Sequence, residues 1–250
     1  MGARQTRYPK KLMRSGIVIF SRMDSRRLPG KALRTISGRA LLGHVIDRVK
    51  NVTGDHQLIV ATSQRSVDDP IAEFAAIEGL DVFRGADDDV LLRATDCAAA
   101  NELDYLTRIS GDSPFVDPRL IEEIVSLAIK TRPDVATNVF PRTFPRGVSI
   151  EVISSSALRT ACERGHDEGE REHITQYFYR CADEFKIANL EAPEAGFGSV
   201  NLAVDNHDDL LRSEWIIRHL TKPLVKTELK EIISVANSWP RDSLQAKVCV

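Results

Sequence analysis

The segment Gly16-Ile17-Val18-Ile19-Phe20 is a continuous apolar run. Such a run is typical of a strand buried on both faces, because a strand with one wet face alternates apolar and polar residues. Apolar residues recur at helical spacing over 41–49, and another strand-like run follows over 57–61. This order of strand, helix and strand predicts a β-α-β unit at the start of the fold.

The same alternation continues toward the C-terminus. Asp117 stands before Pro118, and this pair is typical of a capped helix start. The pattern predicts alternating helices and strands over 69–78, 81–83, 88–101, 105–110, 118–130 and 135–138. It therefore indicates an α/β fold of Rossmann-like type, with a mixed, mostly parallel sheet and helices on both faces.

Residues 140–197 break this regular order. Two proline-containing turns open the segment, and the pattern then predicts a strand, two helices and a strand over 148–153, 156–164, 171–181 and 185–190. We interpret it as a small inserted lobe that binds the acceptor or forms a dimer contact. A strand over 200–204 and helices over 207–220 and 227–237 complete a single domain over 16–250, which follows a basic tail over 1–15.

Composition excludes several classes of protein. The 250 residues are 42% hydrophobic and 28% charged, with a formal net charge of −2, which fits an ordinary globular enzyme and gives no sign of a nucleic-acid partner. No stretch approaches the roughly 18 consecutive apolar residues that span a membrane. The four cysteines form no close pair, so we expect neither a zinc site nor a disulfide framework, and we expect a cytoplasmic location.

The loop after the first predicted strand, residues 21–31, carries four cations beside a Pro-Gly turn. Ligands of open α/β sheets bind outside the carboxyl ends of the strands, where backbone N–H groups can enclose phosphate oxygens. Gly30 lets the backbone approach closely, and Arg22, Arg27 and Lys31 can neutralise a polyphosphate. The alternative is a solvated basic turn, since the loop has neither the GxGxxG nor the Walker A spacing.

Two aspartates follow predicted strands at the same edge. Asp112 comes after the strand over 105–110, and Asp205 after the strand over 200–204. A pair of carboxylates with phosphate oxygens and waters suits Mg²⁺, although each aspartate alone is typical of a turn or a helix cap. Asp208 and Asp209 are expected in the first turn of a helix, not at a metal.

Residues 22–31, read as R-x-x-S-x-R-L-P-G-K, resemble the signature loop of the acylneuraminate and 3-deoxy-manno-octulosonate cytidylyltransferases. The chain looks closest to the subgroup named after spore coat polysaccharide biosynthesis protein F. Four further segments occur in the order of that subgroup: Gly111-Asp112-Ser113-Pro114, Phe144-Pro145-Arg146-Gly147, Glu170-Arg171-Glu172-His173 and the stretch from Val204 to Leu210.

The resemblance implies a nucleotide-diphospho-sugar transferase fold (GT-A-like), CTP as donor, Mg²⁺ as cofactor and a homodimer. It implies that Asp112 and Asp205 hold the metal, and that Arg22 and Lys31 act with them in catalysis. The nucleotide contacts expected on this basis are Ser21, Arg22, Ser25, Arg27, Gly30, Lys31, Thr62, Arg84 and Ser110. The chain departs from sialic acid-activating relatives at Ala203, where they carry Asp, and from octulosonate-activating relatives at Ser110, where they carry Gln.

The acceptor is expected to meet the inserted lobe. Guanidinium groups pair with carboxylates or phosphates through two hydrogen bonds, which favours an anionic acceptor. The candidate residues are Arg142, Arg146, Glu151, Arg171 and His173. For residues 170–173, the alternative is simply the charged first turn of a helix.

These patterns predict transfer of CMP from CTP to an acidic sugar or phosphorylated small molecule, with release of pyrophosphate, in the synthesis of a surface polysaccharide or glycan. One alternative is a glycosyltransferase that uses a nucleotide sugar and a D-x-D metal site, which Asp87-Asp88-Asp89 could imitate. The other is a nucleotide-binding protein without catalytic activity.

Overall fold

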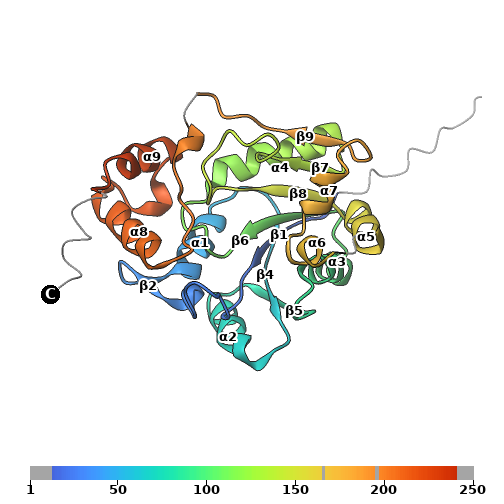
Figure 1. Cartoon of the computed structure of the whole chain (residues 1–250), viewed down its shortest axis with the longest axis horizontal. Coiled ribbons are helices and arrows are strands. Elements are labelled where there is room, and N and C mark those ends of the chain that lie inside the picture. The colour runs from blue at the N-terminus through green and yellow to red at the C-terminus, as the bar shows by residue number, and fades with distance from the viewer. Residues whose placement is uncertain (1–12, 165–166, 195–196, 241–250) are drawn as a thin grey trace, which may run out of the picture.

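The computed structural model describes residues 13–164, 167–194 and 197–240 (Figure 1). Its main feature is a seven-stranded sheet in the order β5-β4-β1-β6-β8-β7-β9. The strands are β1 (Ser15–Phe20), β4 (Gln57–Ser63), β5 (Asp81–Gly85), β6 (Tyr105–Ser110), β7 (Val135–Thr137), β8 (Glu151–Ser154) and β9 (Ile187–Asn189). Only β8 runs antiparallel to its neighbours, so the predicted mixed, mostly parallel sheet is confirmed.

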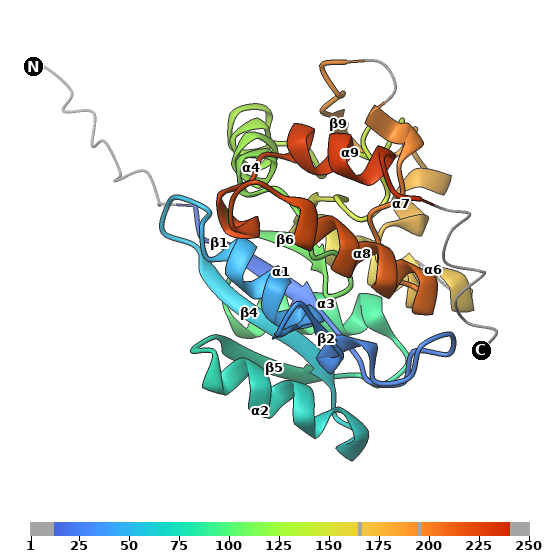
Figure 2. The same ribbon diagram turned by 90° about the vertical axis from the view of Figure 1, so that its left-hand side faces the viewer.

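Helices cover both faces of this sheet (Figures 1 and 2). One core cluster lies under α1 (Leu41–Val49), α2 (Asp69–Ile77) and α4 (Pro118–Thr131), and it extends to α8 (His207–His219) and α9 (Leu229–Asn237). The other lies under α3 (Val90–Ala100), α5 (Ser155–Arg164) and α7 (Gln176–Arg180). Residues 16–20 of β1 are buried between them, as a continuous apolar strand requires.

Local signals fix several element boundaries. The side chain of Asp117 accepts hydrogen bonds from the backbone N–H groups of Arg119 and Leu120, so α4 begins where the capping pattern predicts. Helix α3 begins at Val90 rather than at residue 88, because Asp89 caps it by accepting from the N–H of Leu92. A short hairpin of β2 (Thr35–Ile36) and β3 (Arg39–Ala40) leads into α1.

The segment 140–197 is woven into the main sheet rather than standing apart from it. β8 lies between β6 and β7, β9 forms the edge next to β7, and α5 and α6 (Glu168–Glu172) pack against α3. The helix predicted over 171–181 is two helices, α6 and α7, which are interrupted at residues 173–175. This break lets the hydroxyl of Thr175 donate to the buried carboxylate of Glu151, which a continuous helix would not place there.

The strand predicted over 200–204 is wrong. This apolar stretch forms only a single bridge, between Asn201 and Arg146, and its N–H groups bond to loops: Leu202 to the carbonyl of Arg146, and Val204 to the carbonyl of Asp112. It crosses the edge of the sheet instead of joining it. Val200, Leu202 and Val204 are nevertheless buried, which explains why the composition of this stretch imitates a strand.

Most of the predicted basic tail, residues 1–12, lies outside the described residues, as does Cys249. Within the described part of the chain, Cys97, Cys162 and Cys181 are free thiols. None of the described helices has the length and apolar character needed to cross a membrane.

Candidate functional site

A pocket of about 390 Å³ opens at the carboxyl ends of β1 and β6. The register places Phe20 opposite Ala61 on one side and Ser110 on the other, so the loops after these strands begin at one edge. The lining includes nine of the predicted site residues: Ser21, Arg22, Ser25, Arg27, Lys31, Ser110, Asp112, His173 and Asp205.

The basic loop, residues 21–31, is held in shape by Asp68, a residue that the sequence analysis did not identify. Asp68 is fully buried and accepts hydrogen bonds from the N–H of Met23, at 2.7 Å, and from the hydroxyl of Ser63. The N–H of Gly30 donates to the carbonyl of Met23 at 2.8 Å, and Gly30 adopts a φ of +69° that favours glycine. Gly30 therefore shapes the loop without lining the pocket.

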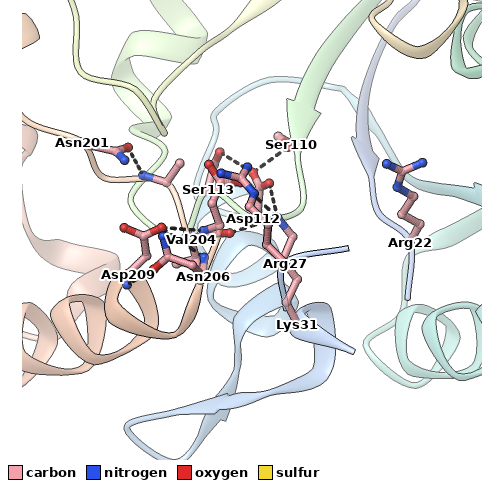
Figure 3. Close-up of polar contacts among 12 residues, drawn as sticks. Arg22, Arg27, Lys31, Ser110, Asp112, Ser113, Asn201, Val204, Asn206 and Asp209 are labelled. Atoms are coloured by element: carbon pink, nitrogen blue, oxygen red, sulfur yellow. Dashed lines mark hydrogen bonds and ion pairs between the residues drawn. The ribbon is translucent and has the colours of Figure 1, made fainter. Parts of the chain in front are cut away.

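Lys31 joins the two predicted metal ligands, and Figure 3 shows it with Asp112. Its Nζ lies 2.7 Å from Oδ2 of Asp112 and 3.5 Å from Oδ1 of Asp205, and it donates to the carbonyl of Val204 at 3.0 Å. Two aspartates that are far apart in sequence thus converge on one ammonium group.

Asp112 is kept ionised within this cluster. Burial alone would raise its pKa, but the charge and hydrogen bond of Lys31, the hydroxyl of Ser110 at 2.7 Å and the charge of Arg108 together lower the pKa below its ordinary value. Asp112 can therefore act as an anionic ligand across the physiological pH range.

Asp205 is positioned by a helix cap, not by a strand. Its N–H and that of Asn206 both donate to Oδ2 of Asp209, and the side chain of Asn206 accepts from the N–H of Asp209, which completes a capping box for α8. The expected place of Asp208 and Asp209 in the first turn is thereby confirmed. The carboxylate of Asp205 pairs with Arg27 at 2.9 Å.

Arg22 stands apart from this cluster in Figure 3, on the loop directly after β1. Its Nη2 lies 2.9 Å from Oε1 of Glu172 on α6, which also lines the pocket. This contact connects the basic loop to α6.

Arg108 is a further lining residue that sequence reasoning missed. It lies on β6 directly opposite Glu151 of β8, and its Nη1 is 2.5 Å from Oε2 of that residue. Glu151 is only 3% exposed, so its carboxylate contacts protein groups and does not line the pocket. A charged residue inside a strand pattern is a weak signal, and the pairing depends on a register that one sequence does not reveal.

The remaining predicted residues lie elsewhere. Thr62 is buried on β4. Arg84 pairs with Asp69 and donates to the carbonyls of Ser63, at the end of β4, and of Arg65, in the loop after it. Arg142 donates to the hydroxyl of Ser149, while Arg146 is exposed beside the 200–204 segment. The structure does not bring these residues into the pocket.

Arg171 also lies outside the pocket, where it pairs with Asp89 at 2.6 Å. Asp89 therefore caps α3 and anchors α6, and Asp87 accepts from the N–H of Gln64. None of the residues 87–89 lines the pocket, which leaves the triplet without the position that a D-x-D metal site would need.

The pocket carries an excess of positive charge. Six of its lining residues are Arg or Lys and three are Asp or Glu. Such a balance favours a polyanionic ligand. The described residues contain no group of three or more His, Cys, Asp or Glu side chains that could hold a metal alone. Asp112 and Asp205 nevertheless fit Mg²⁺, which is commonly held by one or two carboxylates together with substrate phosphates and water.

Comparison with known proteins gives concordant results. A family model described as cytidylyltransferase matches residues 17–200. The spore coat polysaccharide biosynthesis protein SpsF of Bacillus subtilis is 30% identical over 182 residues, which cover 71% of this chain and 75% of that protein.

Two solved structures show the same fold. A cytidylyltransferase from Leptospira borgpetersenii serovar Hardjo-bovis has a TM-score of 0.85 and 29% identity, over 90% of this chain and 94% of that one. The CMP:2-keto-3-deoxy-manno-octonic acid synthetase complexed with CTP has a TM-score of 0.62 and 20% identity, over 80% and 97%. The predicted nucleotide-diphospho-sugar transferase fold is confirmed.

Proposed function

The chain belongs to the cytidylyltransferase family of nucleotidyltransferases, and from this premise we propose that it transfers CMP from CTP to an anionic small-molecule acceptor, with Mg²⁺ and with release of pyrophosphate. The observation that carries the proposal is the convergence of Asp112 and Asp205 on Lys31. This cluster lies in a pocket rich in cations at the carboxyl edge of the sheet.

In the proposed reaction, an acceptor oxygen forms a bond to the α-phosphorus of CTP. The bond from that phosphorus to the bridging oxygen breaks, and pyrophosphate leaves with the electron pair. Asp112 and Asp205 would hold Mg²⁺, which supplies Lewis-acid polarisation of phosphate oxygens when bound. Lys31, Arg22 and Arg27 offset the negative charge that builds on the leaving pyrophosphate.

The protein contributes mainly position and charge. Asp68 and Gly30 fix the loop that carries the cations, and the capping box of α8 fixes Asp205. Groups held in this way lose little freedom when the substrates bind, so more of the binding energy goes into aligning acceptor and phosphate. An acceptor oxygen that is already a carboxylate or phosphate requires no separate base, whereas an acceptor hydroxyl would release its proton to water as the new bond forms.

CTP is proposed as the donor because the relatives are cytidylyltransferases and one neighbouring structure is complexed with CTP. The acceptor class, an acidic sugar or a phosphorylated small molecule, is proposed from the cationic lining of the pocket. The similarity to a spore coat polysaccharide protein supports a role in the synthesis of a surface glycan. A cytoplasmic homodimer is the assembly that we propose for this role.

The test is pyrophosphate release from each of the four nucleoside triphosphates with Mg²⁺, against a panel of acidic and phosphorylated sugars. We expect release with CTP and at least one anionic acceptor, and none when Mg²⁺ is removed by chelation. Preference for another nucleotide would contradict the cytidylyl assignment. Binding of CTP with no release from any acceptor would favour the alternative without catalytic activity, whereas transfer of a sugar with release of a nucleoside diphosphate would favour the glycosyltransferase.

A further inference from the structure

We propose that Arg108 binds the anionic group of the acceptor and that Glu151 is the positioning residue that aims it. The inference rests on the proposed function and assigns the part of the pocket that recognises the second substrate. It also changes the expected role of Glu151, from a direct acceptor ligand to a buried support.

Arg108 is placed where an acceptor would meet the nucleotide. Side chains alternate along a strand, so Arg108 points to the same face of β6 as Ser110, whose hydroxyl donates to Asp112. Arg108 lines the same pocket as Lys31 and Asp112. The basic loop follows β1 on one side of β6, and β8 lies on the other, so Arg108 borders the half of the pocket away from the loop.

Glu151 is fixed by three donors. Its carboxylate accepts from Arg108 Nη1 at 2.5 Å, from the hydroxyl of Thr175 at 2.6 Å and from the hydroxyl of Tyr179 at 2.9 Å. Burial alone would raise its pKa, but Arg108 and the two hydroxyl groups lower it, so the group remains a carboxylate. An enclosed anion with all these partners holds one guanidinium in a single orientation.

The support around Glu151 is itself rigid. The ring of Tyr179 stacks on Phe140 with centroids 4.7 Å apart, and the hydroxyl groups of Tyr179 and Thr137 lie 3.1 Å apart. Thr175 precedes α7 at the break that interrupts the predicted helix. All of these groups except Thr137 come from residues 140–197, the segment expected to meet the acceptor.

Arg108 still has donors to offer. Within the described part of the chain, Glu151 is its one side-chain partner, through Nη1, and its Nε is buried without a hydrogen bond. The side chain remains 24% exposed toward the pocket. Among the described residues, no group accepts a hydrogen bond from Nη2 of Arg108. Donors in folded proteins are nearly always satisfied, so Nη2, rather than the enclosed Nε, indicates a place for a ligand oxygen. Guanidinium favours carboxylate and phosphate, which defines the two anion classes.

The test measures binding in place of turnover. The protein is titrated in two conditions, alone and with both Mg²⁺ and α,β-methylene CTP. The probes are 3-deoxy-manno-octulosonate for the carboxylate, glucose 1-phosphate for the phosphate and glucose as the uncharged control. We expect one acidic probe to bind wild type at least about 10-fold more tightly than Arg108→Gln, with Arg108→Lys between them. The Kd of the CTP analogue should change less than about 3-fold, because the proposal gives Arg108 no contact with the nucleotide, and a 3-fold change is well below the tenfold change expected for the probe.

Glu151→Gln should weaken the same probe while leaving Arg108 in place, and Arg119→Gln, an exposed arginine on α4, should change nothing. Urea denaturation of each variant separates misfolding from lost recognition, and Arg108→Lys keeps the charge if Arg108→Gln fails to fold. The acidic probe whose binding Arg108→Gln weakens shows whether Arg108 recognises a carboxylate or a phosphate on the acceptor.

Equal weakening of the analogue and the probes, or failure of both acidic probes to bind wild type, would overturn the assignment of Arg108. Failure of the analogue to bind wild type is seen in a separate titration, and it would count against the proposed function itself.

Discussion

Replacing Gly147 by alanine should disturb the site from a distance. Gly147 has a φ of +91°, and a Cβ there would lie 2.3 Å from the backbone N of Ala203 and 2.4 Å from the carbonyl carbon of Leu202. These are backbone atoms, so no flexible side chain can give way. The residues directly after Ala203 contact Lys31: the carbonyl of Val204 accepts a hydrogen bond from it, and the carboxylate of Asp205 forms an ion pair with it.

Two effects should lower the free energy of unfolding of Gly147→Ala. A residue other than glycine in the left-handed region costs about 1–2 kcal/mol, and forcing an extra carbon into a filled space costs about 1–3 kcal/mol. Gly147→Ala should therefore lower the free energy of unfolding by about 2–5 kcal/mol. It should also lower pyrophosphate release by the folded protein, because the segment that carries Asp205 must shift.

Gly79→Ala is the matched control. Gly79 has a φ of +76°, but a Cβ there would meet no atom within 4 Å, so only the backbone strain applies. Urea denaturation should show a loss of about 1–2 kcal/mol for Gly79→Ala, without loss of specific activity. Equal losses of stability for the two variants, or full activity in Gly147→Ala, would refute the reasoning.

Three further perturbations test the packing and the charges. Arg48, 1% exposed, donates to three backbone carbonyls and lies 3.4 Å from Asp117. Arg48→Met should therefore lower the free energy of unfolding, measured in urea, by about 3–5 kcal/mol. A loss below about 1 kcal/mol would contradict this, because it would mean that the surrounding groups find other partners. Burial lowers the pKa of His44, so its neutral form favours folding, and the free energy of unfolding should fall as pH drops below the unfolded value of about 6.5. His44→Gln should remove that slope between pH 7 and pH 5, and an unchanged slope would assign it to other groups. Arg27→Ala should change the free energy of unfolding by less than about 1 kcal/mol, because the ion pair of Arg27 with Asp205 is exposed. The same variant should bind CTP about 10-fold more weakly. Unchanged CTP binding would show that Arg27 does not contact the nucleotide.

Much of the fold could be predicted because local signals and packing agree. Helix α1 and strand β6 occupy the predicted ranges, and Asp117 begins α4 as its capping pattern indicates. In each case the apolar periodicity matches the face that the element buries. Residues 200–204 mislead because burial against loops selects the same apolar side chains as burial in a sheet.

The site was predictable where its residues lie in one continuous loop. Residues 21–31 carry their own turn and charges, and the structure places residues of this loop around the pocket at the edge of the sheet. The support of the site could not be predicted in this way. Asp68, Arg108 and Glu151 act through contacts between segments distant in the sequence, and only the register of β6 with β8 places Arg108 opposite Glu151.

The most direct test of the central claim is the rate of CTP-dependent pyrophosphate release by Asp112→Asn, compared with wild type and with Asp208→Asn. Asp112 contacts Lys31 inside the pocket, whereas Asp208 is exposed in the first turn of α8. Loss of a charged group that stabilises the transition state should lower the rate by about 100-fold or more, and Asp208→Asn should retain the wild-type rate. A folded Asp112→Asn protein with a near wild-type rate would contradict the account.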